Sequence, residues 1–352
     1  MEQRVLEWNS QIKPADEQAR KACKDAWDHI SKPLDGLGEL ETIVTRIAAL
    51  TGDIDVDISK RALAIFCADN GIVAEGVSQS DASVTAIVAA AMAREQTSVC
   101  LMAKSANVDI YTIDMGMLTR VPGVRDMHVA DGTGNIAKGP AMSRAQAIEA
   151  IENGITLAKE FKEKGYKILT QGEMGIANTS TSAAIAAVML GLPVETVTGR
   201  GAGLSNAGLD RKVAAIKKAI EVNAPDKSDG IDVLSKLGGF DIAGMAGLII
   251  GGAIYRIPVV IDGVISMAAA LVAAAVCPDC VQAMIASHSG AEPSMEAGLK
   301  KLGLTPVIYA RMKLGEGTGA VCLIPIIDMA LAVYGDAGKF GDSGVEQYVP
   351  QS

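Results

Sequence analysis

The amino-acid sequence predicts an α/β fold, in which helices flank a mainly parallel sheet on both faces in a doubly wound, Rossmann-like arrangement. Short apolar runs alternate with longer helical segments from about residue 61 to residue 286, which is typical of βαβ units. The composition is 49% hydrophobic but only 3% aromatic, and it includes 37 glycines. Small aliphatic side chains must therefore fill the core, and many tight turns must join the elements.

The predicted strands are short apolar runs bounded by turn residues. They cover residues 61–68, 108–113, 166–170, 194–197 and 258–261. A further run at 281–286 is read as either a strand or a buried helix, because periodicity alone does not separate the two.

The predicted helices are longer segments without internal breakers, and most of them fall between these strands. They cover residues 84–103, 144–164, 181–190, 210–222, 241–255, 265–275 and 319–333. Residues 1–50 are predicted as helices with polar faces, interrupted by a turn at 32–38 that contains Pro33, Gly36 and Gly38.

Charge and hydropathy restrict the classes of partner. The net charge of −9 gives no electrostatic footprint for nucleic acid, although helix N-termini could still hold an anionic small substrate. The first four residues are charged or polar and do not begin an apolar signal core. The apolar runs at 242–255 and 263–277 are shorter than the ~20 residues that span a bilayer. We therefore expect a cytoplasmic protein that binds neither nucleic acid nor membrane.

Cys277 and Cys280 form a C-x-x-C motif, which can be a redox pair or half of a metal site. No second C-x-x-C accompanies it, and His29, His128 and His288 are scattered along the chain. The apolar surroundings instead favour two small core residues. We therefore expect neither a metal site nor a redox pair at these two cysteines.

Glycine and polar residues follow the predicted strands. Ligands bind at the carboxyl ends of parallel strands, so these loops should meet at one edge of the sheet. Any one of them is explained by turn formation alone, but together they favour a ligand site. The loops are 69–71, 172–175, 199–203, 262–263 and 287–289.

Motif searches exclude several enzyme classes. The segment 199–204 departs from G-x-G-x-x-G at Leu204, so a nicotinamide dehydrogenase is unsupported. The P-loop, G-x-S-x-G and H-E-x-x-H patterns do not occur. Carboxylates are therefore the natural acid–base candidates, and Glu173 and Glu316 each lie close to glycine on both sides. Either could instead be an acidic residue that favours a helix N-terminus.

Long motifs around both glutamates resemble the nicotinate-nucleotide–dimethylbenzimidazole phosphoribosyltransferase family. The resembling segments are 32–38, 67–71, 75–78, 172–179, 198–203, 237–243, 287–292 and 314–320. The resemblance implies transfer of phosphoribose from nicotinate mononucleotide to 5,6-dimethylbenzimidazole or a related base. The products would be nicotinate and an α-ribazole-type 5′-phosphate for cobamide (vitamin B12) biosynthesis.

The resemblance also implies an organisation. A large α/β catalytic domain would cover 51–317, and a small helical domain would combine 1–50 with 318–352. The enzyme would be a homodimer and would need neither a metal nor a cofactor.

The resemblance assigns roles to individual residues. Glu316 would be the base that deprotonates the incoming acceptor, and Glu173 would orient substrate or stabilise charge that develops on the ribose. Ribose and phosphate would be bound by Gly175, Asn178, Thr179, Gly201, Ala202, Gly203, Ser287 and Ser289. The base pocket would include Gln79, Ile87 and Leu314. His288 would either bind phosphate or simply pack in the core, and we favour packing.

Departures from the family pattern leave two alternatives. Asn70 stands where the family usually has His, Ile87 stands where it often has Gln, and Lys313 replaces an Arg. An apolar wall at Ile87 would suit phenol or p-cresol as acceptor, with this chain as one subunit of a heterodimer with a paralogous subunit. The second alternative is a catalytically silent paralogous subunit, against which the retention of Glu173 and Glu316 argues.

Overall fold

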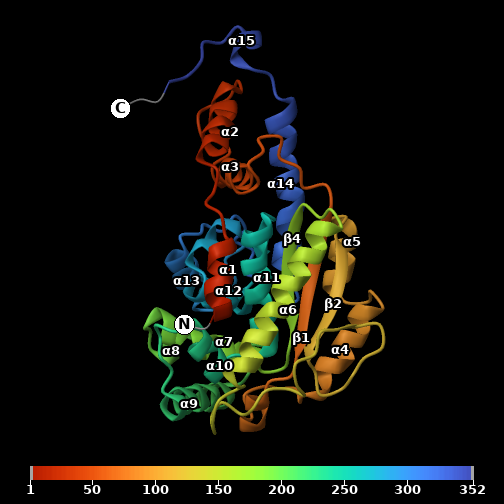
Figure 1. The fold of residues 1–352 in the computed structure, drawn as a ribbon, viewed down its shortest axis with the longest axis vertical. Coiled ribbons are helices and arrows are strands. Elements are labelled where there is room, and N and C mark those ends of the chain that lie inside the picture. Colours follow the sequence, from red (N-terminus) through yellow and green to blue (C-terminus); the bar gives the residue numbers. More distant parts are fainter. Residues whose placement is uncertain (1–2, 350–352) are drawn as a thin grey trace.

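The computed structural model describes residues 3–349, and within them the chain forms a single parallel sheet of six strands. The strand order is β3-β2-β1-β4-β5-β6, and every neighbouring pair is parallel. Strands β2, β1 and β4 are labelled in Figure 1. The strands are β1 (Arg61–Ala68), β2 (Asp109–Gly116), β3 (Arg125–Asp126), β4 (Ile168–Met174), β5 (Val259–Ile261) and β6 (Met284–Ala286). The predicted α/β fold is confirmed.

The central strand β1 shows how the sheet is buried on both faces. Its side chains alternate, so that Ala64 and Phe66 join one hydrophobic core while Leu63 and Ile65 join another. Helices α6 (Arg144–Glu163) and α11 (Phe240–Tyr255) contribute to the first core. Part of the second core comes from α4 (Ser83–Ala93), α5 (Ser98–Ser105) and α14 (Thr318–Asp336). Two covered faces explain the nearly continuous apolar runs of the strands.

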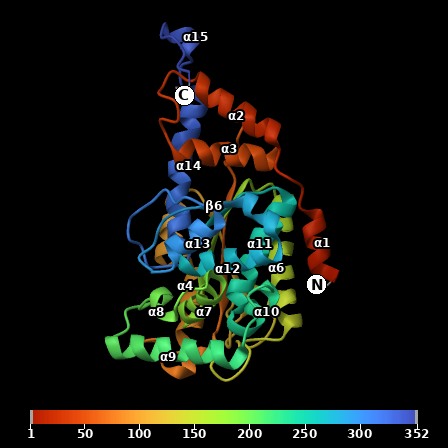
Figure 2. The same cartoon turned by 90° about the vertical axis from the view of Figure 1, so that its left-hand side faces the viewer.

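The remaining helices connect and surround these layers (Figures 1 and 2). They are α1 (Gln3–Gln11), α2 (Glu17–His29), α3 (Glu39–Thr51), α7 (Asn178–Leu190), α8 (Val194–Val197), α9 (Asn206–Asn223), α10 (Gly230–Leu237), α12 (Val264–Val276), α13 (Met295–Leu302) and α15 (Phe340–Ser343). Two 3₁₀ segments, η1 (Gly71–Glu75) and η2 (Pro278–Ala283), precede α4 and β6 respectively.

The helix predicted over 84–103 is two helices, α4 and α5. The chain turns between them because Glu95 adopts the left-handed conformation (φ +56°), which a continuous helix does not allow. Thr97 then takes extended backbone angles as the N-cap of α5. The prediction of one helix was wrong at this break.

The strand predicted over 194–197 is also wrong, because these residues form the short helix α8. Gly191 ends α7 with a left-handed φ of +66°, and Pro193 is the residue that precedes α8. Loop 199–203 therefore follows a helix rather than a strand. The preceding strand is longer than predicted, since β4 continues to Met174 and carries Glu173 within it.

The ambiguous run 281–286 divides into the end of η2 and the strand β6. Helices α10 and α13 and the two-residue strand β3 were not predicted from the sequence. These are short elements whose positions depend on packing against the sheet more than on a strong local pattern.

Above the sheet, α2 and α3 pack beside the end of α14 (Figures 1 and 2). A small separate core there contains Cys23, Trp27, Val44 and Ala330. The ring of Trp27 lies 4.9 Å from that of Tyr334. The first half of α14 and all of α1 pack against the cores of the sheet instead. A small domain of 1–50 plus 318–352 stays a prediction, and residues 1–2 and 350–352 of it lie outside the described part.

Helix α14 is long and apolar enough to span a bilayer by length and composition, which no other helix among the described residues is. Its first half is buried in the core beside β1, with Ala320, Leu323 and Ile324 fully enclosed. A core helix gives the same apolar signal as a membrane span.

Candidate active site

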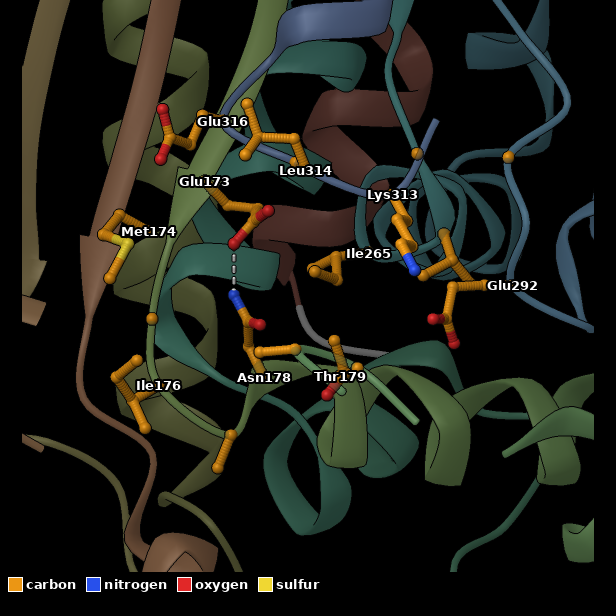
Figure 3. Close-up of a pocket in the computed structure, with 18 of the residues that line it drawn as sticks. Glu173, Met174, Ile176, Asn178, Thr179, Ile265, Glu292, Lys313, Leu314 and Glu316 are labelled. Atoms are coloured by element: carbon orange, nitrogen blue, oxygen red, sulfur yellow. Dashed lines mark hydrogen bonds between the residues drawn. The ribbon is translucent and has the colours of Figure 1, made fainter. Parts of the chain in front are cut away.

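A cavity of about 240 Å³ opens at the carboxyl ends of β4, β5 and β6. The segment after β4, the start of α12 and the segment before α14 form much of its wall (Figure 3). The cavity lies beside the point where the strand order reverses between β1 and β4, which is where doubly wound sheets bind ligands. The loops expected to form a site at the ends of β4, β5 and β6 therefore do meet around one cavity.

Most of the site residues expected from the sequence line this cavity. They are Gln79, Glu173, Gly175, Asn178, Thr179, Gly201, Ala202, Leu314 and Glu316. The walls also include Asp262 and His288, which were not predicted as binding residues. In the sequence, Asp262 is only a turn residue after a predicted strand, and His288 was expected to be a packed core residue.

Four expected residues do not line the cavity. Gly203 lies just behind it, where its carbonyl accepts a hydrogen bond from the Gln79 amide. The buried Ser287 hydroxyl donates to the carbonyl of Ile261 at 2.6 Å, and buried Ser289 follows it along the chain. Ile87 is 62% exposed on α4. Their assigned contacts with substrate stay predictions.

Glu173 is a buried carboxyl group held by donors from two segments. The Asn178 side-chain amide donates to its Oε2 (Figure 3), and the backbone N–H of Glu316 also donates to the carboxylate. Burial, together with the nearby carboxylates of Asp241 and Asp262, raises the pKa of Glu173 well above its usual range. Glu173 therefore binds a proton far more readily than an exposed glutamate.

Asn178 joins Glu173 to a second buried acid. Its Nδ2 also lies 2.9 Å from Oδ2 of Asp241, which is fully buried in the first turn of α11. Burial raises the pKa of Asp241 to about 6. One amide group thus donates to two carboxyl groups, and this fixes the orientation of both relative to the start of α7.

Glu316 precedes α14 in an unusual backbone conformation. Gly315, Glu316 and Gly317 all have positive φ values, of +83°, +62° and +92°. The flanking glycines adopt such angles without strain, whereas a residue with a side chain rarely does. The sequence Gly-Glu-Gly therefore serves to present one carboxyl group in a tight turn.

The environment of the Glu316 carboxyl group suits a general base. Burial, and then the charge of Asp262, raise its pKa, while Thr97 and the N–H of Val99 at the start of α5 lower it through hydrogen bonding. Its Oε2 is buried and has no hydrogen-bond partner among the described residues. Glu316, which lines the cavity, therefore carries an acceptor oxygen that no described residue engages.

The loop 199–203 is held from below by a buried lysine that no sequence motif marks. Lys212 of α9 donates to Thr179 Oγ1 at 2.8 Å and to the carbonyl of Gly199 at 3.2 Å. Burial lowers its pKa to about 8. Since Thr179 Oγ1 accepts this bond, its own hydroxyl proton remains available to a ligand in the cavity.

His288 packs tightly behind the cavity wall. Its Nδ1 lies 2.9 Å from Ser287 Oγ, and the ring covers Gly319, where an added Cβ would lie 2.0 Å from Nδ1. The Ser287 hydroxyl donates its proton to the carbonyl of Ile261, so it cannot also donate to the histidine ring. Nδ1 of His288 is therefore the donor in the bond to Ser287. The expectation of a packed histidine agrees with this burial, although the residue also faces the cavity.

Among the described residues no cluster of three or more His, Cys, Asp or Glu side chains has the arrangement of a metal site. Cys277 and Cys280 are both buried free thiols, and burial raises the pKa of Cys277 to about 12. A thiol of that kind is a core residue and a poor nucleophile or ligand.

Comparison with known proteins gives consistent matches along the chain. A family model described as phosphoribosyltransferase matches residues 12–345. A protein of Ruminiclostridium cellulolyticum is 43% identical over 341 residues, covering 96% of this chain and 97% of its own length. One from Acetivibrio thermocellus is 45% identical over 326 residues, covering 92% and 93%. Both are named nicotinate-nucleotide–dimethylbenzimidazole phosphoribosyltransferase.

Solved structures agree with this. The crystal structure of CobT from Thermus thermophilus superposes with a TM-score of 0.87 at 32% identity, covering 94% of this chain and all of the other. A second structure from the same organism, titled as the nucleotide–dimethylbenzimidazole phosphoribosyltransferase, gives a TM-score of 0.88 at 32% identity over 95% of this chain.

Proposed function

The chain belongs to the nicotinate-nucleotide–dimethylbenzimidazole phosphoribosyltransferase family, and we propose that its cavity transfers phosphoribose from nicotinate mononucleotide to 5,6-dimethylbenzimidazole or a related base. Nicotinate is released, and the product is an α-ribazole-type 5′-phosphate for cobamide biosynthesis. The reaction needs an enclosed site for a nucleotide and an aromatic base, and a group that accepts a proton.

The bond changes define what the protein must supply. One ring nitrogen of the base attacks C1′ of the ribose from the face opposite nicotinate, which inverts a β-nucleotide to an α-product. The electron pair of the broken C1′–N bond returns to the pyridine nitrogen of nicotinate. The proton on the other ring nitrogen of the base then passes to a carboxylate. No oxidant or reductant takes part.

One observation carries the assignment of that carboxylate: Oε2 of Glu316, a residue that lines the cavity, is buried and has no hydrogen-bond partner among the described residues. A free acceptor oxygen on a group of raised pKa is what general-base catalysis requires near neutral pH. Glu173 lies nearby, and its carboxylate accepts a hydrogen bond from the Glu316 backbone. Positive charge on the ribose in the transition state favours its ionised form, so Glu173 stabilises the charge that develops.

The nucleotide end of the cavity is formed by the start of α7 and by loop 199–203. Gly175, Asn178 and Thr179 lead into α7, whose first backbone N–H groups are suited to bind a phosphate. Gly201 lies beside Thr179, where an added Cβ would be 2.9 Å from Thr179 Oγ1, and Gly201 and Ala202 add little side-chain bulk to the wall. We assign ribose and phosphate to this end, and the aromatic base to the end near Leu314 and Glu316.

The acceptor base is assigned as dimethylbenzimidazole rather than phenol or p-cresol. The relatives described above are named for dimethylbenzimidazole. The phenolic alternative depended on Ile87 as an apolar wall, but Ile87 is exposed and lies outside the cavity lining. The Gln79 amide donates to the carbonyls of Ala202 and Gly203, so it does not offer a free donor to a base.

The resemblance to the family also supports a cytoplasmic homodimer as the working assembly. A heterodimer with a paralogous subunit is the alternative. Light scattering on the purified chain distinguishes them, because the chain alone, at 36.4 kDa, gives twice its mass only as a homodimer.

The activity is tested with purified chain, nicotinate mononucleotide and one of three acceptors: dimethylbenzimidazole, phenol or p-cresol. Nicotinate release and the α-nucleotide product are followed by liquid chromatography. Turnover with dimethylbenzimidazole is the expected result. Turnover with the phenols alone would overturn the assigned acceptor. The absence of turnover with all three would indicate a missing partner subunit or a different base, and only after these a silent paralogue.

A further inference from the structure

Asp262 forms a long-range connection that the reaction described above does not use. It follows β5 directly, its side chain is only 2% exposed, and both carboxylate oxygens accept backbone N–H groups. Oδ1 accepts from Gly319 at 2.7 Å and from Ala320 at 3.0 Å. Oδ2 accepts from Gly317 at 3.1 Å. These partners lie 55 to 58 residues further along the chain.

Those three N–H groups belong to the start of α14. The first backbone N–H groups of a helix have no partner within the helix, and a side chain at the N-cap position normally satisfies some of them. Here the N-cap is Gly317, which has no side chain. Asp262 therefore caps α14 from another strand, and its charge is favoured at the positive end of the helix.

The capped residues adjoin the proposed base, since Glu316 immediately precedes Gly317. On the other side, the Glu316 N–H donates to Glu173. The backbone of β4 at Gly172 lies against the backbone of Glu316 and Gly317. The turn 315–317 has glycine on both sides of Glu316 and would otherwise be free to move. The bond from Gly317 to Oδ2 is thus one of the contacts that hold it.

We propose that Asp262 is a positioning residue for the reaction: by capping α14 it holds the Glu316 carboxyl group at the place where the acceptor base loses its proton. The inference rests on the proposed function, and it assigns Asp262 no contact with the reacting atoms. It extends the site from two acidic residues to three, each on a different segment.

The charge of Asp262 provides a second way to test this role, through its effect on the pKa of Glu316. The charged and titratable groups around Asp262 are Glu173, Glu316, His288 and Cys322, while Glu292 and Lys313 line the cavity further away. Among the neighbouring charges, that of Asp262 raises the pKa of Glu316. Loss of this charge should therefore lower the pKa of Glu316.

The substitution Asp262→Asn separates positioning from folding. An asparagine oxygen in place of Oδ1 still accepts from Gly319 and Ala320, so α14 keeps most of its cap. The amide NH₂ in place of Oδ2 faces the N–H of Gly317, and two donors cannot bond. The substitution therefore removes only the hydrogen bond to Gly317, the residue that follows Glu316. Asp229→Asn, which alters the cap of α10 away from the cavity, is the matched control.

We expect Asp262→Asn to keep a KM for nicotinate mononucleotide within about threefold of wild type, with kcat lowered by about 10- to 100-fold. The acid limb of its kcat profile should move to lower pH, because Glu316 must be deprotonated to act. Asp229→Asn should match wild type in both. An unchanged kcat, or a loss of kcat that is uniform across pH and accompanied by weaker nucleotide binding, would overturn the proposal.

Two further measurements keep the test decisive. Amide hydrogen exchange on the wild-type protein should show Gly317, Gly319 and Ala320 strongly protected, and rapid exchange at these residues would contradict the cap even if the variant does not fold. Wild-type turnover is measured in the same assay. Its absence would refute the proposed function, whereas active wild type with an unaffected variant would refute only the role of Asp262.

Discussion

Gly172 of β4 lies directly beneath the backbone of Glu316. A Cβ added at Gly172 would be 2.2 Å from the Glu316 carbonyl oxygen, 2.4 Å from its carbonyl carbon and 2.6 Å from the nitrogen of Gly317. The glycine that precedes Glu173 therefore allows the other glutamate to approach. The two acidic motifs, more than a hundred residues apart in the chain, are in contact through their backbones.

This contact predicts a strong effect of Gly172→Ala. The obstructing atoms are backbone atoms, which cannot move aside as a flexible side chain can, so the turn that carries Glu316 must shift. We expect kcat to fall by about 100-fold while the protein remains folded. Gly139→Ala is the control, because a Cβ there meets no described atom within 4 Å. Steady-state kinetics on both variants test this, and wild-type kcat in Gly172→Ala would contradict it.

Lys212 predicts a different kinetic signature. The substitution Lys212→Met removes the bonds to Thr179 and Gly199 and so releases the loop 199–203 at the nucleotide end. We expect KM for nicotinate mononucleotide to rise about tenfold or more, with a smaller effect on kcat. Lys217→Met on the same helix removes only an exposed ion pair with Glu195, and should leave KM unchanged. A change in kcat alone would be inconsistent with a role in nucleotide binding.

The raised pKa of Asp241 predicts that replacing this residue by asparagine stabilises the protein at high pH. Its folded-state pKa of about 6 exceeds the ordinary value of 3.8, so its stabilising contribution is present below the ordinary value and is lost as pH rises through about 6. Two pKa units correspond to about 3 kcal/mol. The amide of Asp241→Asn could donate to the unpartnered Asn70 Oδ1, which lies close to Asp241 Oδ1.

Asp241→Asn should therefore be more stable than wild type at pH 8, by up to about 3 kcal/mol, and lose this advantage near pH 4. Urea unfolding at the two pH values measures the difference. The same free energy difference at both would show that ionisation of Asp241 does not act on stability.

The pH dependence of the wild-type rate follows from Glu316. Because burial and Asp262 raise its pKa, kcat should fall as pH drops through a value above the 4.5 of an ordinary glutamate. Measuring kcat from pH 4 to pH 9 gives the apparent pKa at which activity is lost on the acid side. An apparent pKa at or below 4.5 would contradict a raised pKa for the base.

Much of the fold could be predicted from the sequence, because the strands of a doubly covered sheet are short apolar runs bounded by turns. The strand β1 was predicted with its observed bounds for this reason. The break between α4 and α5 could not be predicted, since it depends on one residue, Glu95, in a left-handed conformation that no local pattern marks. Residues 194–197 have strand-forming side chains, but they lie outside the sheet, and tertiary context overrides β-propensity.

The candidate site was predictable where glycine marks a close approach, as around Glu173 and Glu316. It was not predictable where the partner is distant in the chain. Asp262 looks like an ordinary turn residue until α14 is brought against it, and Lys212 looks like an ordinary helix-surface lysine until the loop covers it. Ser287 shows the converse, because its hydroxyl looked available and is bonded to a carbonyl of the neighbouring strand.

The central claim is that the Glu316 carboxylate removes the proton from the acceptor base, and a comparison of wild type with Glu316→Gln tests it most directly. Both proteins are incubated with nicotinate mononucleotide and dimethylbenzimidazole at neutral pH, and nicotinate and the α-nucleotide are quantified together. Glutamine has the same shape but cannot take up the proton, so we expect product from wild type and a loss of at least about 100-fold in the variant, with an unchanged melting temperature. Turnover by Glu316→Gln at the wild-type rate would contradict the claim.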